Sequence, residues 1–210
     1  MKKLLYVLFA LLTFTSAAQA QTAKQILDQT AAKLKKSGGL QATFKVGNFT
    51  DGKETGSGSG TIYVKGDKFH IDSPQMKTWF DGKTQWSYLE GSNEVNVSHP
   101  TQAELQSMNP YTFVNLYKQG YTYSLSTATL RGKACHEVTL TATSPRQGIR
   151  KMILDIDKGT GWPLCIRLTQ GQGQWTRISV YDLTAGRRWN DTFFRFNSKD
   201  FPQAEIIDLR

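Results

Sequence analysis

The sequence is poor in the residues that build cross-linked or metal-dependent folds. It has two cysteines and three histidines among 210 residues, too few cysteines for a disulfide scaffold or a cysteine-rich zinc module. His70, His99 and His136 are isolated and lack metal-ligand spacing. We therefore expect neither a metal site nor a cofactor.

Signatures of common enzyme classes are also missing. There is no G-x-S-x-G elbow, no H-E-x-x-H helix and no P-loop. The glycine-rich tract at residues 56–60 leads into a predicted strand rather than a helix, which favours a mobile loop over a phosphate site. Asp155 and Asp157 lie at a predicted strand end, which is more typical of a turn than of paired catalytic carboxylates. We expect the protein not to be an enzyme.

Long hydrophobic runs are absent except at the N-terminus. There, two lysines precede an apolar run at residues 4–14, shorter than the about 20 residues of a membrane-spanning helix. The following A-Q-A supplies small side chains at the −3 and −1 positions of a cleavage site. These features predict a signal peptide at residues 1–20 and a single exported, soluble domain at residues 21–210.

Acidic residues are fewer than basic ones. Lys and Arg number 26 and Asp and Glu 17, for a net charge of +9, and loss of the two leader lysines leaves +7. Because an exported protein rarely meets nucleic acid, no nucleic-acid partner is expected. The basic residues are scattered, except for Lys33, Lys35 and Lys36 and the pair Arg187-Arg188. A solvated surface and attraction to an anionic membrane or an acidic partner both stay open.

One amphipathic helix is predicted at the start of the mature chain. Thr22 and Gln25 have the spacing of a capping box, and two glycines at 38 and 39 end the helix. Its apolar stripe comprises Ile26, Leu27, Ala31 and Leu34. Such a narrow stripe favours packing on a sheet over insertion into a membrane.

From residue 40 the hydrophobic period changes from 3.6 to 2, and turn signals separate short runs. About eleven antiparallel strands are predicted, at residues 40–46, 62–64, 69–71, 86–88, 95–97, 121–126, 135–142, 149–156, 164–170, 175–182 and 192–196. A sheet of this size usually splits or closes, so we expect a mainly β fold, a strongly curved sheet or barrel. A short helical insert near residues 100–118 and the first helix would cover its concave face.

Alternation of apolar and polar residues predicts which side chains face the interior. The candidates for an apolar cavity are Ile62, Val64, Phe69, Ile71, Trp86, Tyr88, Met152, Leu154, Leu164 and Ile166. The helical insert adds Tyr111, Phe113, Val114 and Leu116 as lid residues. For any one of these positions, a dry core and a ligand contact are both open.

The two cysteines present opposing arguments. Export favours a disulfide between Cys135 and Cys165, and both are predicted to face the same side of the sheet. In a simple meander, however, a third strand lies between them and separates their Cα atoms by about 9.6 Å, beyond the limit of about 7 Å. The bridged and the free state both stay open.

The order of several motifs resembles one protein family, the LolA-type periplasmic carriers of outer-membrane lipoproteins. The motifs are G-T-I-Y-V-K at residues 60–65, K-F-H-I at 68–71, F-D-G-K-T-Q-W-S-Y at 80–88 and E-V-N-V at 94–97. The D-G-K-x-x-W-x-Y pattern is the most recognisable of them. The leading helix and the C-terminal stretch from residue 194 to 209 fit as well.

The resemblance implies an unclosed, strongly curved antiparallel barrel with helices as a lid, and no catalysis. It also implies a periplasmic chaperone that takes the acyl chains of lipoproteins from an inner-membrane ABC-type releasing complex to an outer-membrane acceptor. A monomer is expected. A periplasmic binder or sensor of another lipid or hydrophobic ligand on the same fold stays open as the alternative.

The sequence departs from the family after the strand that ends at Val64. The family commonly has an arginine and a proline there, and that arginine is linked to lid closure and release. Here Gly66 stands at the arginine position. Either Lys65 or Lys68 substitutes for it, or the lid is controlled differently. The resemblance predicts that Gly66→Arg alters retention of the cargo more than its capture.

Overall fold

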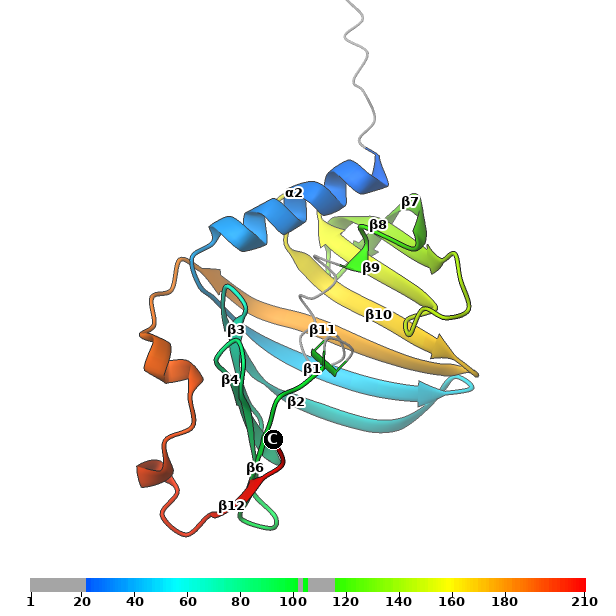
Figure 1. The fold of residues 1–210 in the computed structure, drawn as a ribbon. Helices are drawn as coiled ribbons and strands as arrows, with labels where there is room; N and C mark the ends of the chain where they lie inside the picture. Colours follow the sequence, from blue (N-terminus) through cyan, green and yellow to red (C-terminus); the bar gives the residue numbers. More distant parts are fainter. Residues whose placement is uncertain (1–21, 102–103, 106–115) are drawn as a thin grey trace, which may run out of the picture.

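The fold is one curled sheet with a helix across its concave side (Figure 1). The computed structural model describes residues 22–101, 104–105 and 116–210. The strands are β1 (Leu40–Thr50), β2 (Lys53–Lys65), β3 (Lys68–Asp72), β4 (Met76–Phe80), β5 (Gln85–Leu89), β6 (Glu94–Ser98), β7 (Tyr121–Leu130), β8 (Lys133–Ala142), β9 (Lys151–Asp157), β10 (Pro163–Gly171), β11 (Gln174–Ala185) and β12 (Glu205–Asp208). The helical elements are α2 (Ala23–Lys36) and the 3₁₀ turns η2 (Asp191–Phe194) and η3 (Ser198–Asp200).

The topology is a meander with two pairings between strands that are distant in sequence. The strand order is β12-β6-β5-β4-β3-β2-β1-β11-β10-β9-β8-β7, so β1 pairs with β11 although most of the chain separates them. All pairs are antiparallel except β12, which lies parallel to β6. Strands β12 and β7 form the two edges, and the sheet is not closed. The predicted strongly curved, unclosed, mainly β architecture is confirmed.

Helix α2 forms where the sequence predicts it. The Thr22 hydroxyl accepts a hydrogen bond from the Gln25 amide at 3.2 Å, and the Gln25 side chain accepts one from the Thr22 amide at 2.9 Å, completing the capping box. The predicted apolar stripe is buried, together with Thr30. Since each buried aliphatic side chain contributes about 1.5–3 kcal/mol, packing on the sheet rather than helix propensity holds α2.

The sheet has apolar clusters on both faces. The main cluster fills the concave side between α2 and the strands. The second cluster, formed by Trp79, Tyr88, Val95 and Val97, lies on the convex side of β4, β5 and β6. There it packs against Phe196 and Phe201 of the C-terminal segment, which we define as residues 187–204. Strands β4 to β6 are therefore covered on their convex face as well.

Three strand predictions need correction. The sequence predicts a strand at residues 192–196, but this stretch begins within η2, because the segment packs on the convex face instead of joining the sheet. Strands β4 and β12 were not predicted, so the sheet has twelve strands. The tract at residues 56–60 is not a mobile loop but part of β2, where it pairs with β1.

In this tract, Gly60 is the position at which neighbouring atoms leave no room for a side chain. A Cβ at Gly60 would lie 2.5 Å from the Asp72 carbonyl oxygen and 3.1 Å from Cζ of Phe44. Gly58 lies two residues earlier on the same face, and a Cβ there would have no neighbour within 4 Å. The tract therefore combines one sterically required glycine with one that a larger residue could replace.

The predicted helical insert lies mostly outside the described residues. Within residues 100–118, residues 104, 105 and 116 are helical. The predicted lid residues Tyr111, Phe113 and Val114, and the predicted signal peptide, lie outside the described part of the chain. No helix among the described residues is long and apolar enough to cross a membrane.

Candidate ligand-binding face

A row of apolar side chains runs across six neighbouring strands on the concave side. Directly paired residues of antiparallel strands share a face, and the pairing aligns Leu125 of β7, Val138 of β8, Leu154 of β9, Ile166 of β10, Ile178 of β11 and Val46 of β1. Val138, Leu154 and Ile166 are at most 1% exposed, whereas Leu125 at the sheet edge is 39% exposed. The concave side thus carries a continuous apolar wall.

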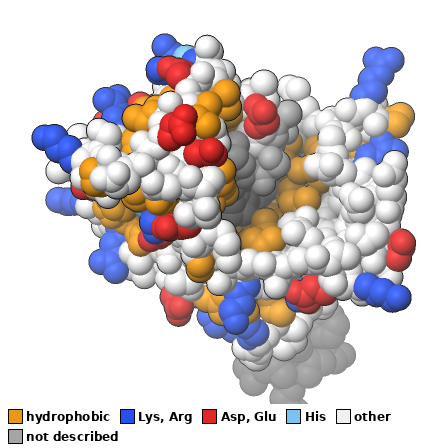
Figure 2. Space-filling model, turned by 90° about the horizontal axis from the view of Figure 1, so that it is seen from below, with side chains coloured by type: hydrophobic (Ala, Val, Ile, Leu, Met, Phe, Trp, Pro, Cys, Tyr) orange, Lys and Arg blue, Asp and Glu red, His pale blue; other side chains and the backbone are white. Residues whose placement is uncertain are grey.

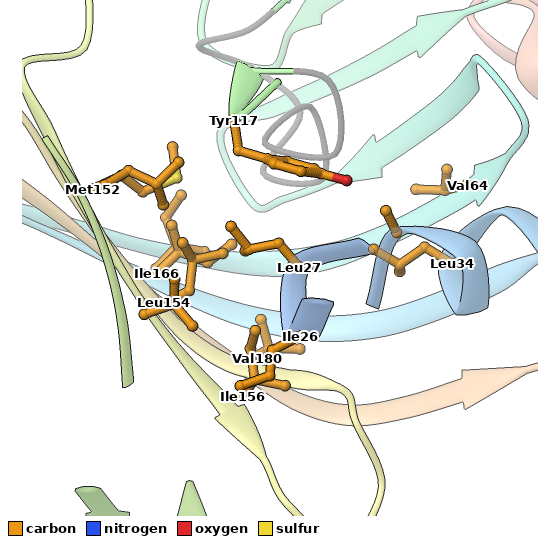
Figure 3. Packing of buried hydrophobic residues seen from close by; sticks show 14 of the residues in the cluster. Ile26, Leu27, Leu34, Val64, Tyr117, Met152, Leu154, Ile156, Ile166 and Val180 are labelled. Atoms are coloured by element: carbon orange, nitrogen blue, oxygen red, sulfur yellow. The ribbon is translucent and has the colours of Figure 1, made fainter. Parts of the chain in front are cut away.

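Helix α2 covers this wall. Figure 3 shows Leu27 pointing toward Met152, Leu154 and Ile166, while Ile26 lies toward Ile156 and Val180. Leu27 is fully buried in this position. A ligand that enters between helix and sheet would replace these contacts with its own apolar surface.

A polar contact ties the middle of α2 to Tyr117, at the end of the helical insert. The Tyr117 hydroxyl donates a 2.5 Å hydrogen bond to Oδ1 of Asp28. The Tyr123 hydroxyl in turn donates to the Tyr117 carbonyl oxygen. Burial, and then the hydrogen bond to Asp28, raises the pKa of Tyr117 far above its usual value. Hydrogen bonds from Lys24 and Tyr117 lower the pKa of Asp28, so the pair is a neutral donor and a charged acceptor.

A second set of contacts holds α2 to the turn between β9 and β10. Lys33 donates to the Thr160 carbonyl oxygen, and its ammonium lies 4.5 Å from the ring centre of Trp162. The Thr30 hydroxyl lies 3.4 Å from the Gly161 carbonyl oxygen. Helix α2 is thus attached by apolar packing along its length and by a few polar bonds.

The side opposite α2 is hollowed, and hydrophobic side chains gather around the hollow (Figure 2). At the far ends of β1, β2, β10 and β11, a pocket of about 340 Å³ is lined by Phe49, Leu168 and Trp175 together with hydroxyl and amide side chains. Leu168 also packs against the main cluster. None of the residues that line this pocket is among the predicted cavity residues.

Most predicted interior residues are brought together on the concave side. The main cluster contains Ile62, Val64, Phe69, Met152, Leu154 and Ile166, and Ile71 packs against it. Leu116, the one predicted lid residue in the described part of the chain, also packs against this cluster.

Trp86 and Tyr88 lie on the opposite face of the sheet, so their assignment to the cavity needs correction. Trp86 pairs with Trp79, and both belong to the convex side with Tyr88. Alternation did identify an apolar face, but β5 has its apolar residues on the face that the C-terminal segment covers. Hydrophobic period alone cannot tell a concave from a convex face.

Leu164 also needs correction. The pairing of β9 with β10 shifts register between Pro163 and Cys165. Such an irregularity breaks simple alternation. Leu164 is half-buried and belongs to neither cluster, whereas Ile166 beyond the shift faces the concave side.

Cys135 and Cys165 are free thiols on the convex side. Strand β9 lies between them, with Asp157 opposite Cys135 and Asp155 opposite Cys165. Burial, and next the charge of Asp155, raises the pKa of both thiols. Because β9 separates the two cysteines, the structure favours the free state over the disulfide.

The two lysines around Gly66 bind the C-terminal segment. Oδ1 of Asp191 lies 3.0 Å from Nζ of Lys65, and its Oδ2 lies 2.6 Å from Nζ of Lys68. Lys65 also donates to the Trp189 carbonyl oxygen at 2.8 Å. These contacts favour the alternative in which the lid is controlled differently, since both lysines are engaged with the C-terminal segment.

An unclosed antiparallel sheet curled around an apolar face, with a helix laid across that face, defines the class of fold. The sequence matches the family described as "Outer membrane lipoprotein carrier protein LolA" over residues 11–172, and the chain belongs to this family. No curated protein matches the sequence significantly.

Several solved structures are similar to this chain at low sequence identity, and the first of the following three has a TM-score above 0.5. An uncharacterised conserved protein from Thermus thermophilus is 16% identical, with a TM-score of 0.59, and the match covers 90% of this chain and 99% of that one. A LolA superfamily protein from Nitrosomonas europaea is 12% identical, with a TM-score of 0.44 and coverage of 84% and 99%. A putative outer membrane lipoprotein-sorting protein domain from Vibrio parahaemolyticus is 14% identical, with a TM-score of 0.45 and coverage of 87% and 98%.

Proposed function

We propose that the protein is a periplasmic chaperone that binds the acyl chains of lipoproteins and carries them from the inner to the outer membrane. The observation that supports this most is the apolar wall across β7 to β11 and β1, covered by one helix. Membership of the carrier family supports the same proposal.

The packing of α2 suits reversible binding. An acyl chain gains about 0.8 kcal/mol for each CH₂ group it buries. Apolar contacts of α2 with the wall are exchangeable for contacts with such a chain. What remains to be broken is a small set of polar bonds, chiefly Tyr117 to Asp28 and Lys33 to Thr160.

The proposal includes no catalysis and no cofactor. Its partners are lipoproteins, an inner-membrane ABC-type releasing complex and an outer-membrane acceptor, and the carrier acts as a monomer. Export by a cleaved signal peptide at residues 1–20 places it in the periplasm.

The alternative is a periplasmic binder or sensor of another lipid or hydrophobic ligand. An apolar wall distinguishes poorly between chains of similar chemistry, because one methylene changes affinity by only about 1–3 kcal/mol. The lipoprotein carrier and the general lipid binder therefore differ in the molecule that they bind, and the apolar wall alone does not distinguish them.

Incubation of spheroplasts with the purified mature protein separates these functions. The carrier function predicts that lipoproteins appear in the soluble fraction in complex with the protein. Native mass spectrometry then identifies the bound species. A soluble fraction without lipoproteins, combined with a different lipid bound to the protein, would contradict the carrier function and support the general lipid binder.

A further inference from the structure

Two basic clusters that are distant in sequence meet at one corner of the molecule. The Gly186 amide donates to the Ser37 carbonyl oxygen at 3.0 Å, and the Arg187 amide donates to the Gly39 carbonyl oxygen at 3.1 Å. These bonds join the end of α2 to the chain leaving β11, at the left of Figure 1. We call the resulting group the basic corner; it comprises Lys33, Lys35, Lys36, Arg187 and Arg188, all exposed.

The positive charge of the basic corner is not neutralised by acids in the described part of the chain. None of its five cations forms an ion pair there. The acid nearest in sequence to Arg188 is Asp191, and both of its carboxylate oxygens are bound by Lys65 and Lys68. By contrast, Arg167 on the convex face is paired with two acids. The corner is thus a local concentration of uncompensated charge.

Two tryptophans accompany these cations. The Lys33 ammonium lies over the ring of Trp162 at 4.5 Å. Trp189 follows Arg188 and packs so closely on Gly39 that a Cβ there would lie 2.6 Å from Cζ3 of the indole. Both tryptophans are half-buried. Cations next to partly exposed tryptophan are typical of surfaces that meet lipid headgroups, where the indole sits at the boundary of water and hydrocarbon.

We infer that the basic corner docks the protein on membranes through anionic phospholipid headgroups. Each Lys or Arg near an anionic bilayer strengthens binding by about fivefold at low salt. The attraction acts within about one Debye length, so it is transient and salt-sensitive. Such contact suits a protein that must approach a membrane and leave it again.

This inference concerns the outer surface and goes beyond the proposed carriage of acyl chains. The corner lies at the C-terminal end of α2, next to the turn at Thr160 and Gly161 that holds the helix. Docking would therefore place one attachment of the covering helix against the bilayer surface. An acidic protein is the competing partner, and the experiment below distinguishes it from lipid.

The test uses the cargo-free mature protein and sucrose-loaded vesicles. Vesicles contain either phosphatidylcholine alone or phosphatidylcholine with about 40% phosphatidylglycerol, and binding is measured by co-sedimentation at low and at high salt. We expect binding to the anionic vesicles only, weakened by salt. The triple variant Lys36→Gln, Arg187→Gln and Arg188→Gln should bind at least about tenfold more weakly.

A second triple variant controls for net charge. Lys53, Arg146 and Arg150 are exposed and lie at the opposite ends of the strands, so Lys53→Gln, Arg146→Gln and Arg150→Gln remove the same charge away from the corner. This control should weaken binding by less than about threefold. Both variants should keep the wild-type affinity for a fluorescent fatty acid, which separates failure of docking from failure of the cavity.

Two outcomes of the vesicle assay alone would overturn the inference. One is absence of binding to anionic vesicles at low salt, and the other is equal weakening by the two triple variants. If the corner variant binds vesicles normally but releases fewer lipoproteins from spheroplasts than the control, the inference is also wrong and the corner serves an acidic protein instead.

Discussion

The Tyr117 hydroxyl and the Asp28 carboxylate form a 2.5 Å hydrogen bond that links α2 to the end of the helical insert. The donor is neutral and the acceptor charged, and a hydrogen bond to a charged group contributes about 1.5–3 kcal/mol. Because Tyr117 is almost fully buried, water does not compete easily for its hydroxyl. We expect this bond to add a polar attachment to the apolar packing that holds α2 in place.

Tyr117→Phe keeps the ring and removes this bond. We expect a fluorescent acyl ligand to dissociate about five- to tenfold faster, with a loss in unfolding free energy of about 1–2 kcal/mol. Stopped-flow displacement measures the rate. Tyr181→Phe is the matched control, since Tyr181 lies on the convex face under Arg131. Equal dissociation rates for the two variants would show that the bond does not hold α2.

Gly60 and Gly58 provide a steric comparison within one strand. Gly60→Ala places a Cβ 2.5 Å from a backbone oxygen, whereas Gly58→Ala meets nothing within 4 Å. We expect Gly60→Ala to lower the free energy of unfolding by about 1–3 kcal/mol. Gly58→Ala should be neutral or stabilising by up to about 1 kcal/mol, since alanine restricts the unfolded chain. Urea denaturation of both variants checks this, and a larger loss for Gly58→Ala would contradict the pairing of β2.

Asp191 should make the attachment of the C-terminal segment depend on pH. Lys68 and then Lys65 lower the pKa of Asp191 from 3.8 to about 2. Since the folded-state pKa is depressed, the stabilisation is present above about pH 4 and is lost as the pH falls through about 2. Asp191→Asn should lack it at every pH. The difference in Trp fluorescence between wild type and variant should therefore vanish as the pH falls below about 2; a difference that stays constant over the whole acid range would contradict this attachment.

Cys135 and Cys165 should both react as free thiols once the protein is denatured. Burial raises their pKa and keeps them from water, so a thiol reagent should react slowly with the folded protein and rapidly after denaturation. A reducing agent should leave the melting temperature unchanged. A mass lower than that of the dithiol form by two hydrogens, or melting that shifts with reductant, would show a bridge instead.

Local signals predicted much of the fold from the sequence. The capping box and apolar stripe located α2, and alternation located residues such as Leu154 and Ile166 on the concave face. These features depend on neighbours in sequence. The parallel pairing of β12 with β6 and the contact of β1 with β11 depend on distant segments, and no local pattern specifies them.

The errors at the site have the same origin. Trp86 alternates as an interior residue would, but the C-terminal segment creates a second apolar face on the convex side. The alternation that predicted Leu164 for the interior fails because the register of β10 against β9 shifts between Pro163 and Cys165. The G-S-G-S-G tract lacks the side chains of a typical strand, yet pairing with β1 keeps it extended. In each case a tertiary contact overrides the local pattern.

Binding of a fluorescent fatty acid to two single variants tests the central claim most directly. Val46 is half-buried on the concave wall opposite Gly58, whereas Ser59 is exposed and paired with Lys45 on the convex face of the neighbouring strand. Each change to glutamate adds one negative charge, and circular dichroism verifies that both variants fold. If the concave face binds acyl chains, Val46→Glu weakens binding by at least about tenfold and Ser59→Glu leaves it unchanged, since a buried unpaired charge costs more than about 1.4 kcal/mol. Wild-type affinity in folded Val46→Glu would contradict the account.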